Sequence, residues 1–284
     1  MRKLLTVGLG FLIFGTLITG CGQQSSSGQS AAAEAAPSAA SAQDIRTEEI
    51  TYQVGDTTLS GYLVYDAASE PRPGVLVVHE WWGHNEYVRT RAYMLAKLGY
   101  SALALDMYGD GKVANHPDDA QKFMNEVMSN ADLSRERFVA AMKILQQHPS
   151  TQANKIAAIG YCMGGGIVLN MARNGMDLKG VASFHGTLGA GEPAQAGAIQ
   201  AKILVAHGAD DPFVPAEQVD AFKAEMDAAG VDYRFIAYPG AVHGFTNPGA
   251  TALGQQFNLP LAYNQSADEQ SWDELKKFLA AIFE

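Results

Sequence analysis

Cysteine and positive charge are both scarce in this sequence. Its 284 residues include two cysteines, and 20 lysines and arginines stand against 30 aspartates and glutamates, which gives a formal net charge of -10. A nucleic-acid backbone is bound by a clustered positive surface, and an acidic chain without a basic stripe lacks one. We therefore expect no nucleic-acid partner.

The N-terminus has the pattern of a secretory signal. Arg2 and Lys3 precede an apolar stretch over residues 4–18, and its length of about 15 residues falls short of the roughly 20 that a membrane-spanning helix needs. The stretch leads into Leu-Ile-Thr-Gly-Cys at residues 17–21, which resembles the lipobox of bacterial lipoproteins. That resemblance implies a signal peptide over residues 1–20 and a lipid on the thiol of Cys21. The alternative is an ordinary cleaved signal with an incidental cysteine.

Residues 21–45 are predicted to be a flexible tether. From residue 22 to about residue 42 the chain is almost entirely Gly, Gln, Ser, Ala and Pro, and Glu34 is its one charged residue. Such a composition buries too little apolar surface to offset the entropy lost on ordering. We therefore expect an exported lipoprotein, anchored to a membrane on its periplasmic or cell-surface side. Its folded part is predicted to be one monomeric domain over residues 46–284.

Short apolar runs alternate with helical stretches in that domain. The segments 47–54 and 58–65 predict a hairpin around Gly55-Asp56. Runs that suit strands buried on both faces of a parallel sheet cover residues 74–79, 102–106, 156–160, 181–184, 203–207 and 234–238. Helices are predicted at residues 87–98, 118–128, 135–147, 164–174, 215–229 and 267–282, the last opening with Ser266 and Glu269 at capping-box spacing. The alternation predicts an α/β fold with a mostly parallel central sheet, helices on both faces, and ligands at the carboxyl ends of the strands.

Cys162 lies at one of these strand ends, in Gly-Tyr-Cys-Met-Gly at residues 160–164. This pattern is typical of the nucleophile elbow of α/β-hydrolases, a strand-to-helix turn so sharp that side chains two residues either side of the nucleophile would clash. The N-terminus of the following helix favours a thiolate. If Cys21 carries a lipid, Cys162 also lacks a disulfide partner, which favours a chemical use for its thiol. The alternative is a small cysteine packed under a glycine-rich turn.

An acid and a histidine follow in the order that α/β-hydrolases use. Asp210 and Asp211 come after the predicted strand at residues 203–207, and His243 comes after the strand at residues 234–238. Either aspartate could orient the imidazole of His243, which would transfer the proton, and the elbow pattern does not choose between them. The alternatives are a solvated turn acid and an ordinary loop histidine. Three suitable residues at successive strand ends weigh against these alternatives.

From about residue 50 to the C-terminus the sequence resembles the dienelactone hydrolase family. The matching segments are His-Glu-Trp-Trp-Gly-His-Asn at residues 79–85, Asp-Met-Tyr at 106–108, Gly-Tyr-Cys-Met-Gly-Gly-Gly at 160–166, Gly-Ala-Asp-Asp-Pro-Phe-Val-Pro at 208–215 and His-Gly-Phe at 243–245. The resemblance implies an α/β-hydrolase fold and a catalytic triad of Cys162, Asp211 and His243. The D-x-F-V-P spacing selects Asp211 rather than Asp210.

The resemblance also implies roles for three residues around the nucleophile. Glu80 matches the family's acid that responds to substrate and helps to form the thiolate, and a structural ion pair is its alternative. The backbone N–H groups of Trp81 and Met163 would form an oxyanion hole. Met163 also fits independently of the family, because the residue after the nucleophile usually donates there.

Two arginines that bind the substrate's carboxylate in the family are replaced by Asp110 and Asn247. Their loss disfavours a carboxylated lactone, although Lys112 is available as a weaker cation. It also leaves open whether Glu80 keeps its family role. Aromatic residues predict an apolar substrate site instead, with core packing as the alternative, and the candidates are Trp81, Trp82, Tyr87, Tyr108 and Phe245.

We therefore expect a dienelactone hydrolase-like enzyme that cleaves carboxylic esters or lactones through an acyl-thioester on Cys162. Its small-molecule substrate is predicted to lack the carboxylate of a true dienelactone. No metal or organic cofactor is expected, because the remaining histidines show no ligand spacing. The alternatives are a lipid-tethered binding protein without turnover and a redox-sensing thiol, which would usually require a resolving cysteine.

Overall fold

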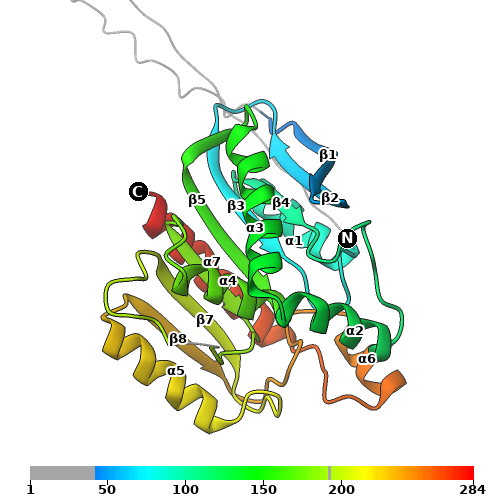
Figure 1. Ribbon diagram of the computed structural model, residues 1–284, viewed down its shortest axis with the longest axis vertical. Coiled ribbons are helices and arrows are strands. Elements are labelled where there is room, and N and C mark those ends of the chain that lie inside the picture. The colour runs from blue at the N-terminus through cyan, green and yellow to red at the C-terminus, as the bar shows by residue number, and fades with distance from the viewer. Residues whose placement is uncertain (1–41, 191–192) are drawn as a thin grey trace, which may run out of the picture. The chain divides into compact units, whose positions relative to one another are not determined.

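The computed structural model describes residues 42–190 and 193–284 (Figure 1). The predicted signal peptide, the predicted tether up to residue 41 and Cys21 lie outside the described residues. The first strand begins at Ile45, one residue before the predicted start of the domain. Within the described ranges, no helix combines the length and the apolar character needed to cross a membrane.

An eight-stranded sheet organises the domain. Its strands, in spatial order, are β1 (Ile45–Val54), β2 (Thr57–Asp66), β4 (Ser101–Leu105), β3 (Arg72–Val78), β5 (Thr151–Tyr161), β6 (Gly180–Phe184), β7 (Lys202–Gly208) and β8 (Tyr233–Tyr238). β1 and β2 form the predicted hairpin, β2 pairs antiparallel with β4, and the other neighbours pair in parallel. The predicted mostly parallel sheet is confirmed. The carboxyl ends of β3 to β8 therefore meet along one edge.

Helices cover both faces of the sheet, as predicted (Figure 1). One face carries α3 (Ala131–Gln147), α4 (Met163–Arg173) and α5 (Ala216–Ala229), and the other carries α1 (Glu86–Lys97) and α7 (Gln265–Phe283). Side chains of a strand alternate between the two faces. In β3, Leu76 and Val78 join the first apolar core, and Val75 and Val77 join the second. Burial on both faces explains why this strand is continuously apolar.

Two further helices, α2 (Pro117–Met128) and α6 (Ala250–Phe257), share a small third apolar cluster. The ring of Phe257 lies 6.1 Å from that of Trp82 in this cluster. Sequence patterning did not predict α6, which has only 8 residues. A helix this short is marginal on its own, so its packing against Trp82 and α2 stabilises it.

The capping box predicted for the last helix is wrong. α7 begins at Gln265, and its N-cap is Asn264, whose side-chain oxygen accepts a hydrogen bond of 3.1 Å from the N–H of Ala267. Asparagine is as effective an N-cap as serine. Because Asn264 occupies the cap two residues earlier, Ser266 and Glu269 lie inside the helix and bond to other helix residues.

Candidate active site

The turn from β5 to α4 places Cys162 at the carboxyl edge of the sheet. β5 ends at Tyr161 and α4 begins at Met163, so Cys162 alone makes the turn, with φ +54° and ψ -119°. A residue with a Cβ atom rarely adopts such a positive φ. A Cβ atom added to Gly160 would lie 2.1 Å from the carbonyl oxygen of Gly164. The close approach of these two glycines therefore allows the sharp turn that the sequence pattern predicts.

Cys162 is also the N-cap of α4, and its side chain makes no capping hydrogen bond. The thiol is half-buried and is not in a disulfide. Unpaired N–H groups and the helix dipole at this position favour a negative charge on the sulfur.

Asp211 and His243 are brought together by two loops at the same edge of the sheet. The Nδ1 atom of His243 lies 2.8 Å from Oδ2 of Asp211, and both residues are buried. The other carboxylate oxygen of Asp211 accepts a hydrogen bond of 2.9 Å from the N–H of Phe213. Asp210 is exposed and instead accepts a hydrogen bond from the N–H of Gly240 at 3.1 Å. Of the two aspartates that the elbow pattern left open, Asp211 is thus the one in contact with His243.

The electrostatic surroundings of His243 favour its charged form. Burial alone would lower its pKa, but the negative charge of Cys162, the hydrogen bond to Asp211 and a hydrogen bond to Cys162 raise the pKa to about 10. An imidazolium is therefore the form that this environment stabilises at neutral pH.

A cavity of about 220 Å³ contains both Cys162 and His243. Its other lining residues come from several elements and are mostly apolar: Trp81, Gln121, Met124, Thr187, Phe213 and Leu261. Among the described residues that line it, none is a lysine or arginine. The cavity therefore suits a small uncharged group better than an anion.

Glu80 is buried next to this site and is held by Asn247. The Nδ2 atom of Asn247 donates a hydrogen bond of 2.6 Å to Oε2 of Glu80, and the N–H of Gly249 fixes the other end of the Asn247 amide. Burial raises the pKa of Glu80 to about 7, although this hydrogen bond and the charges of His243 and Arg91 oppose the rise. Asn247 thus contacts Glu80 and does not line the cavity.

The two predicted oxyanion donors flank the nucleophile in the structure. Met163 is the first residue of α4, and Trp81 lines the cavity. Neither N–H group donates a hydrogen bond to the backbone within the described ranges. The hydroxyl of Tyr108 donates to the carbonyl of Trp81 at 3.0 Å and so fixes the loop that carries this N–H group.

Of the five aromatic residues predicted to bind substrate, Trp81 lines the cavity and the other four do not. Trp82 packs in the third apolar cluster, and Phe245 is fully buried in the second core. The hydroxyl of Tyr87 bonds to Thr246, and that of Tyr108 donates to the carbonyl of Trp81. These positions match the core-packing alternative.

Other residues that line the cavity were missed for different reasons. Phe213 lies two positions after Asp211, in a loop that the sequence already identified as part of the site, so it could have been named as a lining residue. Gln121 and Met124 lie on α2, whose helix was predicted but whose place against the sheet was not. Leu261 follows α6, the helix that the pattern did not predict.

The other polar residues discussed from the sequence lie in structural roles. Nε2 of His79 accepts a hydrogen bond from the backbone N–H of Met107, and Nε2 of His84 lies 3.0 Å from the carbonyl oxygen of Ala104. Lys112 pairs with Asp110 at the surface, and neither lines the cavity. In the part of the chain that the structure describes, no three His, Cys, Asp or Glu side chains are grouped to hold a metal ion.

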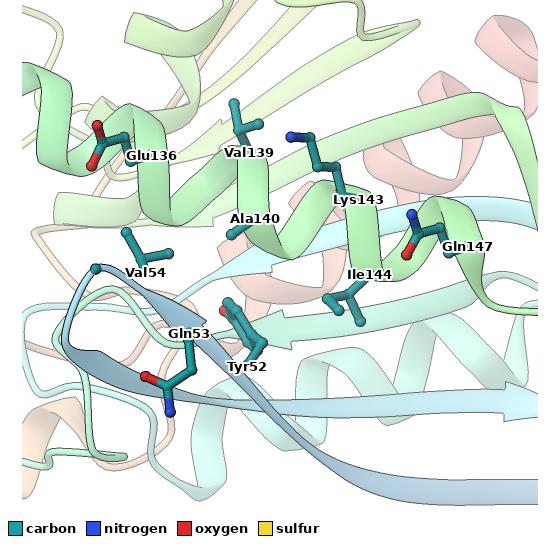
Figure 2. Close-up of a pocket in the computed structure, with 10 residues that line it drawn as sticks. Tyr52, Gln53, Val54, Glu136, Val139, Ala140, Lys143, Ile144 and Gln147 are labelled. Carbon is teal, nitrogen blue, oxygen red and sulfur yellow. The ribbon is translucent and has the colours of Figure 1, made fainter.

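A larger hollow of about 710 Å³ lies between the end of β1 and α3 (Figure 2). Tyr52 and Val54 face Ala140 and Ile144 across it. Its lining includes no cysteine, serine or histidine that could act as a nucleophile or base. Size alone therefore does not mark the reactive site.

The mostly parallel sheet, the strained turn at Cys162 and the Asp211–His243 pair on successive loops define an α/β-hydrolase. The sequence profile of the dienelactone hydrolase family matches residues 59–283. The chain belongs to that family.

Known proteins agree with this assignment. The chain is 26% identical over 271 residues to a putative carboxymethylenebutenolidase of Saccharolobus solfataricus, covering 83% of this chain and 98% of that protein. It is 34% identical to a dienelactone hydrolase-like promiscuous phosphotriesterase from metagenomic libraries, with a TM-score of 0.77 over 84% of this chain and 98% of that one. A putative dienelactone hydrolase from Klebsiella pneumoniae, at 23% identity and a TM-score of 0.68 over 84% of this chain and 99% of that one, shares the fold.

Proposed function

We propose that this protein hydrolyses carboxylic esters or lactones through a covalent thioester on Cys162. One observation carries the proposal: Cys162 at the strained elbow shares a cavity with His243, whose far side is held by Asp211 at 2.8 Å. A nucleophile, a base and an acid that orients the base are the components that acyl transfer requires.

In the acylation step, the thiolate of Cys162 attacks the carbonyl carbon of the substrate. A carbon–sulfur bond forms, and the carbonyl electrons move onto oxygen. When the tetrahedral intermediate collapses, the carbon–oxygen bond to the leaving group breaks, and the imidazolium of His243 protonates the departing oxygen. Asp211 keeps the ring in the orientation that this transfer needs.

Deacylation repeats the sequence with water. Neutral His243 accepts a proton from the water molecule that attacks the thioester, and the carbon–sulfur bond breaks to release the acid. In both steps we assign stabilisation of the oxyanion to the N–H groups of Trp81 and Met163. One donor of this kind typically contributes about 3 kcal/mol to transition-state stabilisation.

His243 is the better candidate for the base that forms the thiolate. Its pKa of about 10 reflects direct interaction with Cys162, whereas the carboxylate of Glu80 is engaged by Asn247. A neutral amide in place of a family arginine gives Glu80 a weaker partner. We therefore assign Glu80 to the support of the site.

The apolar lining indicates a neutral substrate. Trp81, Met124 and Leu261 offer contact area without a counter-ion for a carboxylate. The same lining favours, as a second activity, the hydrolysis of neutral phosphotriesters, which the metagenomic relative is named for. Diethyl 4-nitrophenyl phosphate tests that activity directly.

We further propose that the protein acts as an exported, membrane-tethered monomer with its lipid on Cys21. The lipobox-like end of the apolar stretch supports this localisation. Cys21→Ala should move the protein from the membrane fraction to the soluble fraction, with Ser25→Ala as the matched control. Unchanged fractionation of Cys21→Ala would refute the anchor.

The hydrolase proposal is tested by turnover of 4-nitrophenyl acetate and a neutral lactone by the purified protein. Cys162→Ala and His243→Ala should abolish it. A binding protein on this scaffold would show no turnover in any form. A redox sensor would show peroxide-dependent oxidation of Cys162 without ester cleavage.

A further inference from the structure

A buried histidine beside His243 has no part in the proposed reaction. His185 follows β6, is 1% exposed, and has φ +39°, a conformation in which a non-glycine residue is strained. Its ring centroid lies 5.3 Å from that of His243, with the ring planes at 66°. A strained and buried residue persists only where its surroundings over-determine its conformation. The contacts of His185 show what holds it.

A hydroxyl group ties His185 to the loop that carries His243. The Nε2 atom of His185 lies 2.7 Å from Oγ1 of Thr246, three residues after His243. Thr246 is fixed in turn, because its hydroxyl lies 2.6 Å from that of Tyr87 and its carbonyl accepts a hydrogen bond from Arg91. His185 thus links the carboxyl end of β6 to the His243 loop.

Two arrangements of protons satisfy this chain of contacts with a neutral His185. In one, Tyr87 donates to the hydroxyl oxygen of Thr246, and Thr246 donates to Nε2 of His185; in the other, the Nε2–H of His185 donates to Thr246, and Thr246 donates to Tyr87. Burial, followed by the charges of His243 and Arg91 and a smaller contribution from His207, holds the pKa of His185 well below its usual value. Nδ1 of His185 has no hydrogen-bond partner among the described residues, so Thr246 is its polar anchor.

Besides its hydrogen bond to Cys162, three contacts confine the imidazole of His243. Asp211 holds Nδ1, the ring of Phe213 packs at 5.0 Å and the ring of His185 packs at 5.3 Å. Phe213 is 46% exposed, whereas His185 is enclosed. The buried ring of His185 is therefore the fixed surface against which the imidazole of His243 packs.

We propose that His185 is a positioning residue, whose hydrogen bond with Thr246 keeps the imidazole of His243 directed at Cys162. The inference rests on the proposed role of His243 as base. His185 does not line the cavity, so it acts through His243 and not through substrate.

The test uses variants that separate the hydrogen bond from the backbone strain. Asparagine tolerates a positive φ but is too short to replace the ring of His185. His185→Asn therefore removes that packing surface, and Thr246→Val removes only the anchoring hydroxyl. Thr246→Ser keeps that hydroxyl, and His148→Asn, at the amino-terminal edge of the sheet, is the matched histidine control. Two readouts are compared: kcat and KM for 4-nitrophenyl acetate, and the pH dependence of Cys162 alkylation by iodoacetamide.

His185→Asn and Thr246→Val should each lower kcat by about tenfold or more, with KM within about twofold, since a misplaced base slows chemistry rather than binding. Both should also move the midpoint of Cys162 alkylation to higher pH, because the thiolate loses a well-placed imidazolium. Thr246→Ser and His148→Asn should resemble the wild type. The double variant should lose no more than His185→Asn alone, because the two residues act as one unit.

Unchanged alkylation midpoints in His185→Asn and Thr246→Val would overturn the inference, as would losses that multiply in the double variant. Circular dichroism reports folding, and if His185→Asn fails to fold, the comparison of Thr246→Val with Thr246→Ser decides the question. Alkylation needs no substrate. An absence of ester turnover in the wild type would therefore refute the proposed function while the alkylation profiles still test the positioning of His243.

Discussion

Asn247 donates a hydrogen bond of 2.6 Å to the carboxylate of Glu80, in a position where both residues are buried. A neutral amide cannot balance a buried carboxylate as a cation does, so burial dominates and raises the pKa of Glu80 to about 7. The pairing therefore makes Glu80 a proton-binding group near neutral pH, with consequences for stability.

Glu80→Gln should stabilise the protein at pH 8.5 and have little effect at pH 4.5. The folded protein holds the Glu80 proton more tightly than the unfolded chain does, so the stabilisation from Glu80 is complete below about pH 4.5 and is lost as the pH rises through about 7. The pKa shift of Glu80 corresponds to a gain of about 3 kcal/mol at most in the free energy of unfolding of Glu80→Gln at pH 8.5. Urea unfolding at both pH values measures it. If Glu80→Gln and the wild type differed in free energy of unfolding by the same amount at the two pH values, this reading of Glu80 would be contradicted. A glutamine variant less stable than the wild type at pH 8.5 would also contradict it.

Asp211→Asn should lower kcat for ester hydrolysis by roughly 10²–10⁴-fold, because the amide favours the wrong orientation or tautomer of His243. Asp210→Asn is the matched control, since Asp210 is adjacent in the chain, exposed and bonded only to the N–H of Gly240. It should retain nearly full activity. Similar losses in both variants would show that the loop as a whole, and not the Asp211–His243 contact, controls turnover.

Cys162→Gly should be more stable than Cys162→Ala by about 1 kcal/mol, although both lose activity. The positive φ of residue 162 strains any side chain that carries a Cβ atom, and glycine removes that strain. Lys122 is exposed inside α2 and serves as the control position. There, Lys122→Ala should be more stable than Lys122→Gly, because alanine is the better helix former. Thermal unfolding of the four variants checks the claim, and an alanine variant as stable as glycine at position 162 would show that the turn is unstrained.

Anionic acyl groups should be poor substrates. The mono-4-nitrophenyl ester of succinic acid should show a kcat/KM about tenfold or more below that of 4-nitrophenyl butyrate, because no lysine or arginine among the described cavity residues compensates its carboxylate. Met124→Arg should narrow this gap by supplying a cation, and Lys122→Arg controls for added guanidinium on α2. Equal rates for the two esters with the wild-type protein would refute a cavity selective for neutral groups.

The layout of the fold was predictable because strong local patterns agreed with the global arrangement. The apolar run of β3 needed burial on both faces, and the turn at Cys162 needed Gly160 to have no side chain against the backbone of Gly164. Asp211 was separated from Asp210 only by family resemblance, and the structure supplies the contact that distinguishes them.

The substrate cavity was not predictable in the same way. Its walls depend on where α2 and Leu261 lie against the sheet, which is a tertiary outcome that no local spacing encodes. Aromatic character also does not determine the direction of a side chain. Phe245, two residues after His243, points into the core against Tyr238, whereas Phe213 remains at the cavity.

The most direct test of the account is the capture of an acyl group on Cys162. The purified protein is mixed with 4-nitrophenyl acetate, quenched with acid within the first turnover, and analysed by intact-protein and peptide mass spectrometry. We predict one acetyl group per protein, located on the peptide that contains Cys162 and absent from Cys162→Ala. Turnover without an acetylated Cys162, or turnover that persists in Cys162→Ala, would contradict the account.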